Sequence, residues 1–276
     1  MINYSIIIPH KNSPELLDRC LASIPQRNDI EIIVVDDNSD FAKKPQTSRI
    51  GVKIINIEKE NSKGAGRARN VGLKEATGKW LLFADCDDYY INDCFSKLDK
   101  LKDTDYDIIF FDNDTNLNIT GDAFHNRLEK MLKGDKRDKA NFKHFSNTPW
   151  NKMYKRTFVY ENDIQFDEIP IQNDAYFVHK ASLLTDNFFY IDKKLYYYEI
   201  NEKGITRRKR SKKDIEQLIT TAIKLDKLRA KSGAWDCIYF QLNKQYINGY
   251  GNLFILKQQL RRIRHGLLWY IIRKKF

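Results

Sequence analysis

Residues 80–90 read WLLFADCDDYY, an apolar stretch that ends in three aspartates within four positions. The run of bulky apolar side chains at 80–84 predicts a fully buried β-strand. Three further apolar, β-branched runs precede it, at 4–8, 30–35 and 52–57. The chain therefore opens with a series of predicted buried strands, and the second and fourth of them end in acidic side chains.

Helical segments are expected between these strands. Ser13 and Pro14 are typical of a helix start, with Ser13 as the N-cap. Residues 65–76 and 92–101 predict further helices, and 108–111 predicts another strand. Strand and helix alternate, which predicts a doubly wound α/β fold with a mainly parallel sheet. Ligands of such sheets bind beyond the carboxyl ends of the strands, where the acidic clusters lie.

Length and composition narrow the class of protein. With 276 residues, of which 42% are hydrophobic and 13% aromatic, the chain can bury enough apolar surface to fold. No apolar run approaches the roughly 18 residues of a membrane-spanning helix. The four cysteines show no CxxC spacing, so no zinc site is expected. The N-terminus opens into a strand-like run without a charged leader, so we expect a cytoplasmic protein.

The net charge of +11 is unevenly distributed. Residues 203–276 hold 19 Lys and Arg against 4 Asp and Glu, a net charge of +15, whereas residues 1–202 have a net charge of −4. We therefore expect a domain at 1–202 and a basic, helical C-terminal region at 203–276. Such a basic region suggests a polyanionic partner, either nucleic acid or an anionic membrane surface.

Beyond residue 120 the strand–helix alternation fades. Residues 122–145 predict a polar helix, 188–198 an aromatic-rich strand, 211–231 an amphipathic helix and 235–276 further helices. The expected architecture is a mixed, mainly parallel sheet flanked by helices, with a helical extension at the C-terminus.

The two acidic clusters differ in what they indicate. A single pair such as Asp36 and Asp37 often serves as a turn or helix cap. Asp85, Asp87 and Asp88 instead crowd three carboxylates, which repel one another unless a cation neutralises them. A divalent ion such as Mg²⁺ or Mn²⁺ takes oxygen ligands and leaves positions for phosphate oxygens. The sequence therefore predicts a metal-assisted phosphate site at the end of the fourth strand.

The segment between the clusters, GAGRARN at 64–70, places two arginines at the start of a helix. It lacks the third glycine of a dinucleotide-binding loop and the GK[ST] of a P-loop. Free backbone N–H groups and arginine side chains at a helix start suit a diphosphate or a nucleobase carbonyl. The alternative interpretation is a solvated helix start.

Several blocks, taken in order, resemble the family 2 glycosyltransferases of the GT-A fold, a type common in bacterial capsule, O-antigen and exopolysaccharide assembly. The blocks are SIIIPHKN at 5–12, IIVVDDNSD at 32–40, GAGRARNVGLKEATG at 64–78, WLLFADCDDYY at 80–90, WNKMYKR at 150–156 and NDAYF at 173–177. The resemblance covers residues 4–206. It implies an inverting transferase with a nucleotide-sugar half at 1–120 and an acceptor half at 121–202.

The resemblance also implies roles for individual residues. Asp37 would accept the uracil N3–H of a UDP-sugar, Asp87 would ligate Mn²⁺ or Mg²⁺, and Asp174 would be the catalytic base. Asp85 would contact ribose or metal-bound water, and Asp88 would line the donor-sugar site. The complete set of donor-site residues that it implies is Pro9, Asn12, Asp36, Asp37, Gly64, Arg69, Asn70, Asp85 and Asp88.

The chemistry of the reaction is consistent with these roles. Glycosyl transfer passes through an oxocarbenium-like state, and inversion needs a base on the face opposite the leaving group. A metal that holds a diphosphate leaving group replaces a general acid. The alternative for Asp174 is a helix N-terminal residue. Asn173 departs from the family, which usually has glutamate there, and its amide is expected to hydrogen-bond the acceptor or a loop.

Three more residues are candidates for the acceptor side or for a lid. Trp150 and Tyr154 lie four apart, on one face if that segment is helical, and Trp150 would either stack on a sugar or fill the core. Lys152 would reach a phosphate. Arg207 belongs to the basic stretch GITRRKR at 204–210, which would either close over the diphosphate or form a solvated linker.

The end of the chain, KQQLRRIRHGLLWYIIRKKF at 257–276, is basic and amphipathic. Such a helix suits the interface of an anionic membrane leaflet, and the alternative is a terminal helix packed on the domain. Membrane contact fits the polyprenol-linked saccharide acceptor that the family suggests. We therefore expect peripheral attachment to the inner face of the plasma membrane and no nucleic-acid partner. A homo-oligomer stays open.

Two other classes compete with a hexosyl- or N-acetylhexosaminyltransferase. A nucleotidyltransferase of related fold also uses Asp-x-Asp and a metal, but PHKN at 9–12 stands where that class needs a glycine-rich loop. A nucleic-acid-binding protein would use the basic end, which lacks the interleaved aromatic pattern of such modules. UDP is favoured over GDP and TDP, while the donor sugar, the acceptor and the linkage stay open.

Overall fold

The computed structural model describes residues 1–116, 133, 143, 147–200, 210–232 and 260. The chain forms two compact units, Met1–Gly204 and Ile205–Phe276. Apart from residues 133 and 143, the helix predicted at 122–145 lies outside the described residues. The same holds for Arg207 and, apart from residue 260, for the helices predicted at 235–276.

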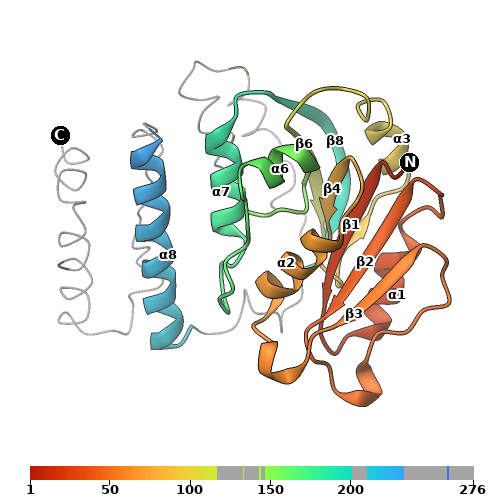
Figure 1. Ribbon diagram of the computed structural model, residues 1–276, viewed down its shortest axis with the longest axis horizontal. Helices are drawn as coiled ribbons and strands as arrows, with labels where there is room; N and C mark the ends of the chain where they lie inside the picture. Colours follow the sequence, from red (N-terminus) through yellow and green to blue (C-terminus); the bar gives the residue numbers. More distant parts are fainter. Residues whose placement is uncertain (117–132, 134–142, 144–146, 201–209, 233–259, 261–276) are drawn as a thin grey trace. The chain divides into compact units, whose positions relative to one another are not determined.

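One mixed sheet organises the first unit (Figure 1), with the strand order β3-β2-β1-β4-β7-β6-β8-β5. Its first half is parallel and consists of β3 (Val52–Asn56), β2 (Ile30–Asp36), β1 (Tyr4–His10) and β4 (Trp80–Phe83). These are the four strands that the apolar runs predict. The carboxyl ends of β1, β2 and β4 consequently meet at one edge of the sheet.

The second half of the sheet mixes directions. β7 (Lys152–Lys155) pairs antiparallel with β4 and with β6 (Ile108–Thr115). β8 (Phe188–Tyr198) runs parallel to β6, and the short β5 (Tyr89–Tyr90) pairs antiparallel with β8. The predicted mixed, mainly parallel sheet is confirmed.

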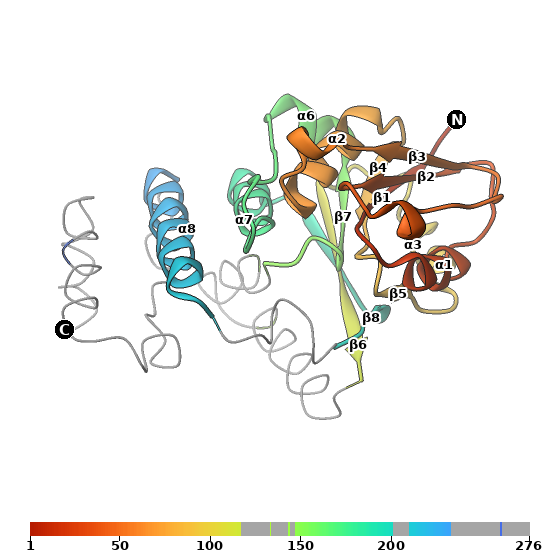
Figure 2. The same cartoon turned by 90° about the horizontal axis from the view of Figure 1, so that it is seen from below.

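Helices cover both faces of the sheet (Figure 2). Apolar side chains of α1 (Pro14–Ala22) and α3 (Cys94–Leu98) join one core cluster. Those of α2 (Ala65–Glu75), α6 (Arg156–Glu161) and α7 (Ala175–Leu184) join the cluster on the opposite face. Both faces of the central strands are therefore buried, which explains their continuous apolar runs.

The strand β1 shows how closely these layers pack. Tyr4, Ile6 and Ile8 belong to the first cluster and Ile7 to the second, as the alternation of a strand requires. A Cβ atom added to Gly72 on α2 would lie 2.5 Å from Cγ2 of Ile7. Glycine at position 72 thus lets α2 approach β1.

Two local details are decided by the folded structure. Residues 152–155 form a strand, so Trp150 and Tyr154 do not share a helix face, and Met153 and Tyr154 are buried in the clusters on opposite faces of the sheet. Ser13 is the N-cap residue of α1, as predicted, but its Oγ makes no capping hydrogen bond and instead donates to the carbonyl of Lys11 at 3.2 Å. Tertiary pairing decides the first case, and a competing local hydrogen bond decides the second.

In the second unit the structure describes α8 (Lys212–Lys231), the amphipathic helix predicted at 211–231. Its start forms a reciprocal cap. Ser211 N–H donates to Asp214 Oδ2 at 2.8 Å, and Asp214 N–H donates to Ser211 Oγ at 3.1 Å. Among the described residues, no helix combines the length and apolar character that crossing a membrane requires.

Candidate active site

The start of α2 connects the two acidic strand ends that the sequence predicts as a site. Gly64 N–H donates to Asp37 Oδ2, after β2, at 2.9 Å. One turn further along, Arg69 forms an ion pair with Asp85, after β4. Both acidic clusters and the GAGRARN segment therefore lie together at the carboxyl edge of the parallel strands.

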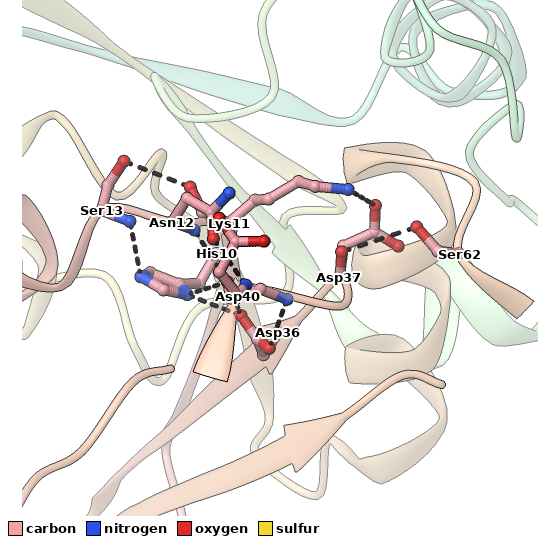
Figure 3. Close-up of polar contacts among 9 residues, drawn as sticks. His10, Lys11, Asn12, Ser13, Asp36, Asp37, Asp40 and Ser62 are labelled. Atoms are coloured by element: carbon pink, nitrogen blue, oxygen red, sulfur yellow. Dashed lines mark hydrogen bonds and ion pairs between the residues drawn. The ribbon is translucent and has the colours of Figure 1, made fainter. Parts of the chain in front are cut away.

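Asp37 is 3% exposed, yet one of its oxygens has no partner. Oδ2 accepts from Gly64 N–H and lies 3.6 Å from Lys11 Nζ (Figure 3). Oδ1 is buried and makes no hydrogen bond within the described part of the chain. A buried acceptor of this kind is unfavourable until a donor reaches it.

Both carboxylate oxygens of Asp36, by contrast, have partners within the protein. It is fully buried, its Oδ1 lies 2.8 Å from His10 Nδ1, and its Oδ2 accepts from Ser39 N–H at 3.0 Å. Asn12 lies in the neighbouring loop, with a backbone φ of 55°. Its Oδ1 accepts from Asp40 N–H at 2.8 Å, so Asn12 and Asp36 both fix the loops at this edge. Pro9 lies buried inside β1.

Arg69 connects the carboxyl edge of the parallel strands to the segment that carries Asp174. Besides its ion pair with Asp85, its Nη1 donates to Asn173 Oδ1 at 2.8 Å. Its guanidinium also lies 5.4 Å from the centre of the Phe166 ring. The side-chain amide of Asn173 thus contacts a residue of helix α2, neither of the two partners that the sequence suggested, an acceptor or a loop.

Asn70 does not face an open site. It is 7% exposed, its Nδ2 donates to the Phe166 carbonyl at 3.0 Å, and its Oδ1 accepts from Phe166 N–H at 2.9 Å. These two bonds satisfy the backbone of the 162–174 loop, which connects α6 to α7. Asn70 therefore has a structural role, and its expected contact with the nucleotide stays a prediction.

Asp88 is also engaged within the protein. It is fully buried, and its oxygens accept from Tyr196 Oη and Glu199 N–H, both at 2.9 Å. Burial, with Asp85 and Asp87 nearby, raises the pKa of Asp88 to about 9. These contacts anchor the end of β8, and the expected place of Asp88 beside the donor sugar stays a prediction.

Asp85 and Asp87 are the partly exposed members of this cluster. Burial and the nearby charge of Asp85 raise the pKa of Asp87. Arg19 donates to the carbonyl of Asp87 at 2.5 Å and pairs with Glu199 at 2.6 Å, which holds the turn. Within the described ranges, no group of three His, Cys, Asp or Glu side chains is arranged to hold a metal ion.

Asp174 occupies the N-cap position of α7 but makes no capping hydrogen bond with its side chain. Its carboxylate is therefore not used to begin the helix. Burial raises its pKa and Asp85 adds to the effect, whereas the positive charges of Arg69 and Lys152 act against it. A carboxylate with these neighbours remains ionisable and is more basic than usual.

Lys152 and Trp150 belong to the interior. Lys152 is 1% exposed, its Nζ donates to Thr148 O at 2.6 Å and to Asn151 Oδ1 at 2.7 Å, and burial lowers its pKa to about 7. Trp150 is 6% exposed and stacks on Tyr196, with ring centres 4.8 Å apart. Trp150 fills the core, and Lys152 is too buried to reach a phosphate outside it.

Sequence reasoning missed several residues that shape this edge, among them His10, Arg19 and Tyr196. Tyr196 Oη accepts from Asp85 N–H at 3.0 Å and donates to Asp88. It lies 111 positions from Asp85, so no local pattern reveals the contact. His10 had a local signal, because a histidine that ends a buried strand needs polar partners.

Sheet topology and site together define the class of protein: a mixed α/β fold with one polar ligand edge, the architecture of the GT-A fold. The chain belongs to the glycosyl transferase family 2, whose model matches residues 5–162. The resemblance of the sequence blocks and the family model therefore lead to the same family, and the sheet has the fold expected of it.

Individual relatives are more distant. The chain is 28% identical to the glycosyltransferase GlyA of Streptococcus pneumoniae over 220 residues, which cover 74% of this chain and 31% of GlyA. It is 26% identical to the poly(ribitol-phosphate) β-N-acetylglucosaminyltransferase TarS of Staphylococcus aureus over 215 residues, covering 74% of this chain and 36% of TarS. The chain thus spans about a third of these two relatives.

Solved structures support the fold. TarS 1–349 of S. aureus in complex with UDP-GlcNAc aligns with a TM-score of 0.65 and 23% identity, over 90% of this chain and 79% of that one. The mannosyltransferase PcManGT of Pyrobaculum calidifontis, in complex with GDP-Man and Mn²⁺, aligns with a TM-score of 0.54 and 14% identity, over 95% and 74%. At these identities the likeness concerns the fold alone.

Proposed function

We propose that this chain transfers a hexose or N-acetylhexosamine from a UDP-sugar to a hydroxyl group of a saccharide acceptor, with inversion at the anomeric carbon. The observation that carries the proposal is the buried, unpartnered Oδ1 of Asp37 at the carboxyl edge of the described sheet. A ligand that supplies an N–H donor removes this unfavourable state. The N3–H of uracil is such a donor.

The second oxygen of Asp37 supports the choice of base. Oδ2 already accepts from Gly64 N–H, so Oδ1 is left for a single donor. Uracil and thymine present a single ring N–H between two carbonyl acceptors, guanine presents a ring N–H beside an amino group, and adenine and cytosine present an amino group beside a ring nitrogen that only accepts. The UDP-GlcNAc bound to TarS supports the same base. In this proposal Pro9 borders the base, and Asp36 and Asn12 fix the surrounding loops.

Asp87 is the proposed protein ligand of Mn²⁺ or Mg²⁺, with Asp85 beside it at the ribose or a metal-bound water. Both carboxylates are partly exposed, and burial together with Asp85 raises the pKa of Asp87, which suits a bound cation. Such a cation neutralises a diphosphate leaving group. Because the described residues offer no three-residue cage, donor phosphate oxygens would complete the coordination.

Asp174 is the proposed catalytic base. It takes the proton of the acceptor hydroxyl while that oxygen bonds to the anomeric carbon and the bond to the diphosphate breaks. The raised pKa of Asp174 makes its carboxylate a stronger proton acceptor, and the positive charge of Arg69 opposes its protonation in the resting site. Asn173 holds Arg69 next to this base.

The proposed acceptor and cellular location rest on a named relative and on the charge distribution of the chain. TarS is named for a poly(ribitol-phosphate) acceptor, which supports a saccharide- or polyol-based polymer for this chain as well. The net charge of +15 at 203–276 supports contact with an anionic membrane at its cytoplasmic face. A polyprenol-linked saccharide acceptor would lie at that same surface.

Thermal unfolding with UDP, GDP, TDP and ATP, each with and without Mn²⁺, tests the proposal. A nucleotide at about 100 times its Kd stabilises the fold by about 2.7 kcal/mol. We expect UDP with Mn²⁺ to stabilise the wild type most, and Asp87→Ala to lose the effect of Mn²⁺. Asp174→Asn should retain the UDP effect but transfer sugar about 10²- to 10⁴-fold more slowly. The proposal is contradicted if ATP stabilises the protein most, or if none of the four nucleotides stabilises it.

A further inference from the structure

His10 ends β1 with a ring that is 1% exposed and that the proposed mechanism does not use. Its Nδ1 lies 2.8 Å from Asp36 Oδ1, at the end of β2. On its other side, Ser13 N–H donates to Nε2 at 3.2 Å, just before α1 (Figure 3). One imidazole therefore bridges the ends of two strands and the start of a helix.

These partners allow only one neutral tautomer. A backbone N–H can only donate, so Nε2 must carry the lone pair that accepts from Ser13. The proton of the neutral ring then lies on Nδ1, where it donates to the carboxylate of Asp36. With the proton on Nε2 instead, two donors would face each other at Ser13 and two acceptors at Asp36.

The bridge extends through both loops at the ligand edge. Ser39 Oγ donates to Asp36 Oδ1 at 2.5 Å and accepts from Asn12 N–H at 2.7 Å. Asn12 Oδ1 accepts from Asp40 N–H at 2.8 Å. These contacts join the loop after β1 to the loop after β2, directly around Asp37.

Asp37 depends on the same bridge through the backbone. Its N–H donates to the carbonyl of His10 at 2.9 Å, as the last bond between β1 and β2. Loss of the imidazole would leave the buried carboxylate of Asp36 short of a donor and loosen both loops. The unpartnered Oδ1 of Asp37 would then no longer be held in one place.

We propose that His10, as the Nδ1–H tautomer, is a positioning residue that locks the loops after β1 and β2 and so fixes the carboxylate of Asp37 for its ligand. His10 acts through Asp36 and touches no reacting atom. The part that concerns nucleotide binding rests on the proposed function, whereas the tautomer and the loop contacts do not.

The tautomer is measured without any ligand, by ¹⁵N NMR of the full chain labelled in its histidine rings. The signals of His10 are identified by their loss in His10→Phe. We expect a protonated Nδ1 and an unprotonated Nε2. A protonated Nε2, or a ring that averages both forms, overturns the proposal.

Loop locking is measured by amide hydrogen exchange at Ser13, Ser39 and Asp40 in His10→Phe and His10→Asn. Phenylalanine keeps the size of the ring without its nitrogens, and asparagine restores an N–H donor toward Asp36. We expect faster exchange at these amides in His10→Phe and slower exchange in His10→Asn than in His10→Phe. Unchanged exchange in His10→Phe overturns the proposal.

Nucleotide affinity then separates positioning from plain stability. We expect the Kd of UDP to rise about 10- to 100-fold in His10→Phe and to recover in part in His10→Asn. The control is His179→Phe, which removes a second buried histidine, on α7, and should lower stability without changing this Kd. An equal loss in both phenylalanine variants overturns the proposal. If the wild type itself binds no UDP, the proposed function fails while the exchange data still test the lock.

Discussion

At the level of single residues, the aspartates at the carboxyl edge of the sheet differ in how many of their oxygens have a hydrogen-bond donor. Both oxygens of Asp88 have donors, from Tyr196 and Glu199, and the residue is part of the framework. Asp37 is almost equally buried but keeps one oxygen without a donor. Because a buried acceptor is usually paired in native proteins, the unpartnered Oδ1 supports the proposal that a ligand binds here.

The first prediction concerns that oxygen. Asp37→Ala removes the acceptor and should raise the Kd of UDP about 10- to 100-fold, as expected for a hydrogen bond to a charged group. Isothermal titration measures the change. Asp40→Ala is the matched control, because its side chain is exposed and lies in the same loop. If both variants lose the same affinity, net charge rather than the Asp37 acceptor explains the binding.

The second prediction concerns Lys152, whose pKa burial lowers from 10.5 to about 7. Between these values the unfolded chain binds more protons here than the folded chain, so the free energy of unfolding rises with pH. Below pH 7 both states are protonated and the dependence disappears. From pH 7 to 9, urea unfolding should show a rise about 2 kcal/mol larger in the wild type than in Lys152→Met. If the free energy of unfolding changes with pH in the same way in both proteins, the pKa of Lys152 is not lowered by burial.

At the level of elements, the 162–174 loop is docked on α2 by side chains of that helix. Asn70 pairs with the backbone of Phe166, and Arg69 holds Asn173. Between them, Gly66 leaves room for the loop, because a Cβ atom there would lie 2.1 Å from the carbonyl oxygen of Asp167. The position of Asp174 thus depends on a helix that also touches Asp37 and Asp85.

The third prediction follows from this contact. Gly66→Ala should displace the loop, lower kcat more than the affinity for UDP, and destabilise the fold by about 1–3 kcal/mol. Gly72→Ala is the matched control on the same helix, since its Cβ would meet the Ile7 side chain at 2.5 Å, away from the loop. Steady-state kinetics and urea unfolding of both variants separate the effects. If kcat falls relative to UDP affinity by the same factor in Gly66→Ala and Gly72→Ala, the role of Gly66 in placing the loop is contradicted.

Elements with a strong local pattern were predictable, and others were not. The runs at 30–35 and 80–84 became β2 and β4 because each is apolar on both faces. In β6, the polar residues 112–115 extend the strand beyond the predicted 108–111, since β8 pairs with them. Strand pairing of this kind depends on a partner far along the chain.

At the level of the whole molecule, charge is distributed unevenly along the sequence. The region 203–276 holds the excess of positive charge, while 1–202 is slightly acidic. Each Lys or Arg near an anionic leaflet contributes about 1 kcal/mol to binding, an effect that salt screens. The proposed acidic donor site and the proposed membrane contact of the basic region therefore fall in different parts of the sequence.

The fourth prediction tests that surface. In flotation assays the full chain should bind vesicles that contain anionic lipid, and salt should release it. Replacing Arg261, Arg262 and Arg264 by Gln should weaken this binding about tenfold or more. Zwitterionic vesicles are the control for lipid alone, and thermal unfolding with UDP is the control for the fold. Binding that is indifferent to salt and to the three arginines would contradict the prediction.

Local pattern along the chain was enough for the parallel half of the sheet, for the acidic strand ends and for the family. These features depend on neighbouring residues, whose periodicity and turn chemistry are readable in sequence. Only the tertiary structure decided which carboxylate oxygens are bonded within the protein and which are left without a donor. Tyr196 covers Asp88 from 108 positions away, and Arg69 reaches Asn173 across 104 positions. Burial and pairing across such separations arise when the chain folds, because a side chain's neighbours in space are not its neighbours in sequence.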